Sequence, residues 1–176
     1  MVRTVITIIS GLFLVSALAL PTPAQNPPEP SADNKKLESV LDEGKFFYRK
    51  SYNEPAQRWE YNIAWEQSGE TSMINIYLRN WGSRGDGSKI NVVYLWATVA
   101  EAPKGETLSP ELIKLVASSN DNVYTGNFST SGNAIVANSG FFLTGLSKEM
   151  LELSVMDLHA NRVAMKKEAE KIVADR

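Results

Sequence analysis

Residues able to do acid–base or metal chemistry are scarce in this chain. His159 is the only histidine, and there is no cysteine. Asp157 precedes the histidine by two residues, a spacing that sends the two side chains to different faces of a helix, so they are poorly arranged to share a metal ion. No nucleophile-elbow motif accompanies them. We therefore interpret His159 as an ordinary helix residue, and we expect no catalytic residues, no metal and no cofactor.

Carboxylates are the one group that stays open to a catalytic interpretation. The chain has 20 Asp and Glu residues, and glycosidase-type chemistry needs only two carboxylates held close to the substrate. Nothing in their spacing marks one pair above the others. A periplasmic hydrolase that uses carboxylates is therefore kept as the alternative function.

A glycine-rich segment at 82–87 is interpreted as a hairpin loop. Phosphate-binding loops lead into the N-terminus of a helix, whereas this segment lies between two predicted strands. It contains the adhesion tripeptide Arg84-Gly85-Asp86, which we treat as a chance match.

Aromatic side chains supply the candidate binding residues. Most aromatic residues in and beside the predicted strands are interpreted as core packing and cross-strand pairs, because strands favour aromatic side chains in any case. Tyr77, Tyr94 and Trp96 are the exceptions, since they alternate with the more clearly apolar faces of their strands. We predict that these three residues form a surface that binds a protein or peptide partner.

Three consecutive strands must position these aromatic residues. Apolar side chains alternate with polar ones at 59–65 and 74–78, and the run at 90–99 is apolar on both sides. Alternation with period two indicates a strand with one buried face, and a strand that is apolar on both faces is typical of the middle of a sheet. Glycines fall in both short links, which favours an antiparallel meander.

Helices are predicted on either side of this meander. A first helix is expected at 35–44, and Ser109 followed by Pro110 predicts the start of a second. A second hairpin at 123–143 and a final helix from Lys148 complete the pattern. The sequence therefore predicts an α+β fold of order α-β-β-β-α-β-β-α, an antiparallel sheet of about five strands with helices packed on one face. Whether 46–48 form a strand or a hydrophobic plug is left open.

This order of elements resembles the type III secretion chaperone-like superfamily, which includes the Tir-chaperone and YbjN-like proteins. The matching positions lie between 35 and 174 and are packing and capping positions: the segment 108–115, Asn120, Phe128, Gly132, Ile135, Phe142, Leu146, Ser147 and Leu151. The resemblance implies an α+β fold, non-enzymatic binding of protein segments and a tendency to form a homodimer. It supplies no catalytic residues.

The N-terminus predicts export. Arg3 precedes an uncharged, mostly apolar run at 5–20, and Pro21 with a small-residue site ending at Ala24 follows it. This is the layout of a secretory signal peptide. Chaperones of the superfamily are mostly cytoplasmic and lack such a segment, so we expect a partner other than a type III effector.

Export sets the predicted domain organisation. Residues 1–24 are a signal peptide cleaved after Ala24, 25–34 are a proline-rich spacer, and 35–176 are a single α+β domain. The mature protein is expected in the periplasm or secreted, and it meets the membrane only during export. If the apolar run were retained instead, the chain would be a membrane-tethered structural protein, which is a further alternative.

The net charge of the chain argues against a nucleic acid partner. The formal net charge is −2, whereas phosphate backbones are bound by clustered Lys and Arg. We therefore expect no nucleic acid partner.

Overall fold

The computed structural model describes residues 27–120 and 126–174. The predicted signal peptide, its cleavage site and the start of the predicted strand at 123 lie outside these ranges. The fold is α+β, with one antiparallel sheet of strand order β1-β2-β3-β4-β6-β5 and three α-helices. The elements are α1 Ala32–Glu43, β1 Tyr48–Asn53, β2 Arg58–Gln67, β3 Glu70–Ser83, β4 Lys89–Glu101, α2 Pro110–Ser119, β5 Asn127–Ser131, β6 Ala134–Phe142, the short 3-10 helix η2 Leu143–Gly145 and α3 Lys148–Ala174.

The central meander is confirmed. β2 pairs with β3, and β3 pairs with β4, both antiparallel. The link between β2 and β3 is tight because Ser68 and Gly69 both take positive φ angles, 55° and 79°, which is the backbone that two-residue hairpin loops require. The register places Tyr77 directly opposite Tyr94.

The sheet has six strands, not about five. The extra strand is β1, which begins at Tyr48 and pairs antiparallel with β2. Its turn into β2 is held by Asn53, whose Oδ1 accepts from the Ala56 N–H at 3.0 Å. Phe46, just before the strand, packs against the ring of Trp65 at 6.1 Å between centroids. The segment left open in the sequence therefore divides into a plug residue and a strand.

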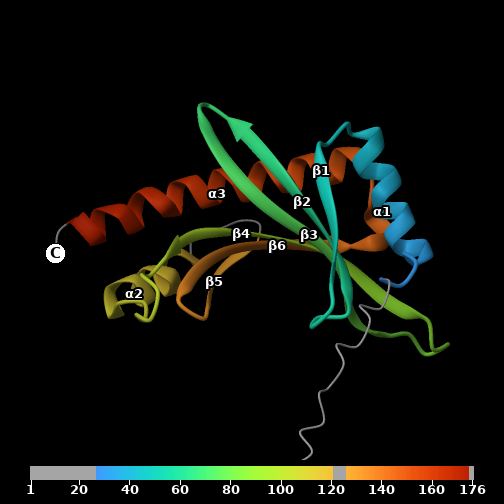
Figure 1. Cartoon of the computed structure of the whole chain (residues 1–176), viewed down its shortest axis with the longest axis horizontal. Helices are drawn as coiled ribbons and strands as arrows, with labels where there is room; N and C mark the ends of the chain where they lie inside the picture. Colours follow the sequence, from blue (N-terminus) through green and yellow to red (C-terminus); the bar gives the residue numbers. More distant parts are fainter. Residues whose placement is uncertain (1–26, 121–125, 175–176) are drawn as a thin grey trace, which may run out of the picture.

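All three helices lie on one face of the sheet. Their buried side chains join those of the strands in one hydrophobic cluster. Figure 1 shows α3 running along the sheet, with α1 at one end and α2 near the other. No helix in the described ranges is both long enough and apolar enough to cross a membrane.

The first helix begins at Ala32, three residues earlier than the sequence predicted. The reason is Ser31, whose Oγ accepts from the Asn34 N–H at 3.2 Å and caps the helix. On the inner side of α1, the carboxylate of Glu38 accepts from the buried Tyr61 hydroxyl at 2.8 Å. The predicted start of the second helix is confirmed, because Ser109 is its N-cap and Pro110 its first residue.

A candidate binding face on the open side of the sheet

The sheet face away from the helices is called the open face here. Side chains alternate along each strand, so residues in register with Tyr77 and Tyr94 lie opposite the buried face that carries Ile76 and Leu95. Across the strands, the open face comprises Glu60, Asn62, Met73, Asn75, Tyr77, Arg79, Val92, Tyr94, Trp96, Asn138, Gly140 and Phe142. No described helix packs on it, so this face is where a partner can approach.

Two of the three predicted binding residues form its centre. The rings of Tyr77 and Tyr94 lie 5.2 Å apart between centroids. The Arg58 guanidinium lies 3.5 Å above the Tyr77 ring, and Arg79 lies 5.9 Å from the Tyr94 ring. Tyr77 is thereby only 7 % exposed. It cannot contact a partner directly. Its ring packs against the ring of Tyr94 and holds that side chain in place.

Tyr94 is half-buried and oriented by a hydrogen bond. Its hydroxyl donates to Asn138 Oδ1 at 2.6 Å, and Asn138 Nδ2 donates in turn to Ser129 Oγ at 2.8 Å. Burial of the hydroxyl, together with the neighbouring Tyr77, raises the pKa of Tyr94. The side chain is therefore a fixed, neutral aromatic surface near neutral pH.

A network of hydrogen bonds around Glu60 on β2 holds the polar side chains of the open face next to Tyr77. Glu60 accepts from Arg58 Nε at 2.8 Å, from Asn53 at 2.9 Å and from Asn75 at 3.0 Å. Burial acts to raise the pKa of Glu60, but these hydrogen bonds to Arg58, Asn75 and Asn53 outweigh it and the pKa is lowered. Asn75 also donates to Asn62 Oδ1 at 3.0 Å. Glu60 is thus held as a charged acceptor, the opposite of what a general acid needs.

Trp96, the third predicted residue, lies half-buried between Asn75 and Asn138 on the neighbouring strands. Two exposed aromatic side chains of this region lie elsewhere. Trp81 at the bulge of β3 is 68 % exposed and Phe142 at the end of β6 is 55 % exposed. Sequence reasoning did not select these two, because Phe142 reaches the tyrosines only through the pairing of β6 with β4. That pairing brings together residues that are far apart in the chain.

Trp81, Tyr94 and Phe142 surround a hollow of about 570 Å³. Val92, Asn138 and Gly140 also line it. A Cβ at Gly140 would lie 3.2 Å from Val92 Cγ1 and 3.6 Å from Tyr94 Cδ2, so these two side chains border the hollow at the glycine. The hollow is large enough for one or two side chains of a partner, and its walls are mainly apolar with several aromatic rings, as in the centres of protein interfaces.

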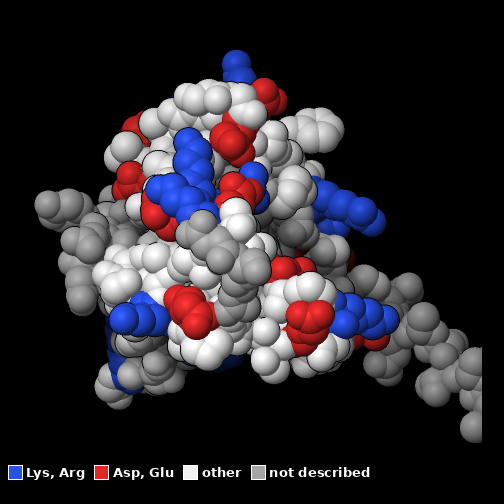
Figure 2. All heavy atoms as spheres, turned by 90° about the vertical axis from the view of Figure 1, so that its left-hand side faces the viewer, with Lys and Arg blue, Asp and Glu red and all other residues white. Residues whose placement is uncertain are grey.

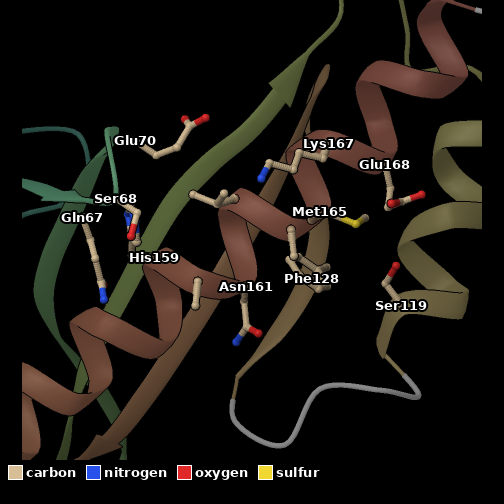
Figure 3. A pocket seen from close by; sticks show the side chains of 13 residues that line it. Gln67, Ser68, Glu70, Ser119, Phe128, His159, Asn161, Met165, Lys167 and Glu168 are labelled. Atoms are coloured by element: carbon tan, nitrogen blue, oxygen red, sulfur yellow. The ribbon is translucent and has the colours of Figure 1, made fainter.

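A second hollow, of about 690 Å³, lies over α3 (Figure 3). Its side chains come from the β2–β3 turn on one side of α3 and from the end of α2 on the other, and they are spread along the helix. The two carboxylates that line it are paired with lysines, since Glu70 lies 3.6 Å from Lys166 and Glu168 lies 2.7 Å from Lys171. This arrangement offers no convergent carboxylate pair for the alternative hydrolase.

His159 lines the same hollow, but it is 4 % exposed. Its Nδ1 lies 2.8 Å from the hydroxyl of Ser72, which is fully buried. Arg162 of the same helix donates to the Thr98 carbonyl at 2.7 Å. No substrate can reach the serine, so this cluster joins α3 to β3 and β4. The sequence offered no signal for the partner of His159, because Ser72 lies on a strand distant in the chain.

Charges are mixed on the end of the molecule where α3 finishes. Figure 2 shows Lys and Arg side chains interspersed with Asp and Glu over this end. Lys166, for example, lies between Glu70 and Glu170, at 3.6 and 3.7 Å. Among the residues that the structure describes on this side, the basic side chains do not form a separate patch.

No protein-family model matches the chain, and a search of curated proteins finds no match either. The resemblance to the type III secretion chaperone-like superfamily therefore stays a prediction from the sequence.

Proposed function

We propose that this protein is an exported, non-catalytic domain that binds an extended protein segment on its open face. The observation that carries the proposal is the aromatic hollow formed by Trp81, Tyr94 and Phe142 on the face that the helices leave uncovered. Exposed tryptophan and phenylalanine beside a fixed tyrosine are typical of interface hot spots.

The polar groups of the face favour binding over catalysis. Glu60 is occupied by three hydrogen-bond donors and Tyr94 donates to Asn138. A catalytic carboxyl needs a raised pKa and an open path to the substrate, whereas the pKa of Glu60 is lowered. These side chains act instead as a rigid support, which limits the conformational entropy lost on binding.

The contribution of Phe142 to the binding free energy can be calculated from its exposed area. An aromatic side chain buries about 150–250 Å², so its exposed half offers roughly 100 Å² to a partner, worth about 2.5 kcal/mol at about 25 cal/mol per Å². Part of this contribution is offset by the entropy that the side chain and the partner lose on association. We therefore expect Phe142→Ala to weaken binding roughly tenfold to fiftyfold.

The test is a selection of linear peptides from a displayed random library on the purified protein, followed by affinity measurements on the enriched peptides. Phe142→Ala should weaken their binding as stated. Ile113→Ala is the matched control, because Ile113 is 51 % exposed but lies on α2, on the helix side. Failure to enrich any peptide, or equal affinities for the wild type and Phe142→Ala, would rule out the proposed function.

A further inference from the structure

We propose that a second binding site lies where α1, η2 and the turn between β3 and β4 meet, and that it takes a small molecule carrying a phosphate monoester group. Lys36, Arg84 and Lys89 hold the phosphate. The site goes beyond the proposed function and does not depend on it.

Three cations surround one hollow at this place. The hollow has a volume of about 430 Å³, and ligand pockets in proteins measure about 300–1,000 Å³. Lys36 lies on α1, Arg84 follows β3, and Lys89 is the first residue of β4. The packing of α1 on the sheet brings Lys36 to the other two, although it is far from them in the chain.

The charges of these three residues are available to a ligand. Within the ranges that the structure describes, none of the three takes part in an ion pair. Lys36 Nζ donates to the Leu143 carbonyl at 3.3 Å, which holds it at the hollow. A carbonyl is a neutral acceptor, so the ammonium keeps its charge and two further protons for an anion.

Hydrogen bonds within the β3–β4 turn position Arg84. Its N–H donates to the Ser88 carbonyl at 2.8 Å, and its carbonyl accepts from the Gly87 N–H at 2.9 Å. The carboxylate of the turn, Asp86, accepts from the N–H and the hydroxyl of Ser88, at 2.9 and 2.7 Å. Asp86 forms no ion pair with Arg84 or Lys89 and does not line the hollow. The glycine-rich segment thus presents a cationic side chain, whereas phosphate-binding loops use their backbone.

The charge of the lining matches a dianion. Asp33 is the one carboxylate among the described residues that line the hollow, and it accepts from Asn91 Nδ2. Three cations and one carboxylate give a net charge of +2. A phosphate monoester carries about −1.5 to −2 at pH 7. Arginine binds phosphate through its planar fork of donors and lysine binds it as a point charge.

Apolar side chains indicate that the phosphate belongs to a larger molecule. Ile90 and Phe142 line the same hollow beside the cations, and Phe142 is 55 % exposed. Free phosphate would leave these side chains in water, whereas the carbon skeleton of a monoester would cover them. A polynucleotide fits less well, because its affinity comes from contacts with several successive phosphates.

The test is an NMR titration of the isotope-labelled protein with phenyl phosphate at pH 8 and low salt. Phenyl sulfate has a similar shape but a single negative charge, and phenol is neutral. We expect saturable shifts of the amides of Arg84, Lys89 and Thr144. Phenyl sulfate should bind at least about fivefold more weakly, because it lacks one of the two charges, and phenol should cause no shifts at these amides.

Three variants test the role of charge. Arg84→Gln should weaken the binding of phenyl phosphate about tenfold, as expected for one lost hydrogen-bonded charge pair. Asp33→Asn removes the negative charge of the lining and should tighten binding about threefold. Opposite effects of these two variants separate charge recognition from a loss of structure. Arg49→Gln is the matched control, because it removes an exposed cation at the far edge of the sheet, and the affinity should not change.

Three results would overturn this site: shifts that do not saturate, equal affinities for phenyl sulfate and phenyl phosphate, or equal losses in Arg84→Gln and Arg49→Gln. Peptide binding by the open face is measured with a different probe, so the proposed function would stand in each case.

Discussion

Glu60→Gln tests whether the hydrogen-bond network around Glu60 is a charged support of the open face. The carboxylate of Glu60 accepts from Arg58, Asn53 and Asn75 at 2.8 to 3.0 Å. A glutamine removes the charge and turns one acceptor into an amide that faces the donors. Hydrogen bonds to charged groups contribute about 1.5–3 kcal/mol, so we expect the free energy of unfolding to fall by about 2 kcal/mol at pH 7. For a chain of this size that is a fall in Tm of roughly 4–8 °C.

The effect should depend on pH in a defined direction. The pKa of Glu60 is lowered in the folded protein, so the carboxylate stabilises the fold above its unfolded pKa of about 4.3, and this contribution is lost as the pH falls through the folded pKa. The difference between wild type and Glu60→Gln should therefore shrink in acid.

Urea unfolding at neutral and at acidic pH measures both the free energy of unfolding lost in Glu60→Gln and the change of that loss with pH. Glu66→Gln is the matched control, because Glu66 lies on the same strand but is exposed, and it should change the free energy of unfolding by less than about 0.5 kcal/mol. A Glu60→Gln protein as stable as the control at neutral pH, or a difference that does not change with pH, would refute the reasoning.

Three further predictions concern the rest of the molecule. Ser72→Ala leaves the buried Nδ1 of His159 without its partner at 2.8 Å, so the free energy of unfolding should fall by about 1–3 kcal/mol in denaturant titrations; unchanged stability would contradict the role given to this pair. Asn120→Ala frees the backbone of Phe128, so exchange of the Phe128 amide should accelerate while the amides of β4 do not change; an unaltered rate would show that the edge of β5 is closed by other means. If the predicted signal peptide is cleaved, the protein purified from its native source should begin at Gln25 by mass spectrometry, and a full-length mass would instead support the membrane-tethered alternative.

Much of the fold follows from local patterns in the sequence. The alternation of apolar residues in the central strands predicted their buried faces, and Tyr61, Ile63, Ile74 and Ile76 are indeed buried. The signal at Ser109 gave the start of α2, because a capping residue and a proline act within one turn. Such features depend only on residues that are close together in the chain, so the sequence shows them directly.

The parts that could not be predicted depend on residues distant in the chain. β1 is short and rich in charged residues, so only its pairing with β2 identifies it as a strand. Tyr77 is buried because Arg58 covers its ring, a contact across strands that periodicity does not reveal. The aromatic hollow exists because β6 lies beside β4 and ends next to Trp81. Strand order is set by the packing of the whole domain. The candidate site depends on strand order, so it could not be predicted from local patterns either.

The most direct test of the binding face is to locate a bound peptide by intermolecular NMR contacts. With an isotope-labelled probe peptide from the displayed library, we expect contacts to the ring protons of Trp81, Tyr94 and Phe142. Contacts to Gln67 and Lys167, which are exposed and line the hollow over α3, with none to these three rings, would contradict it.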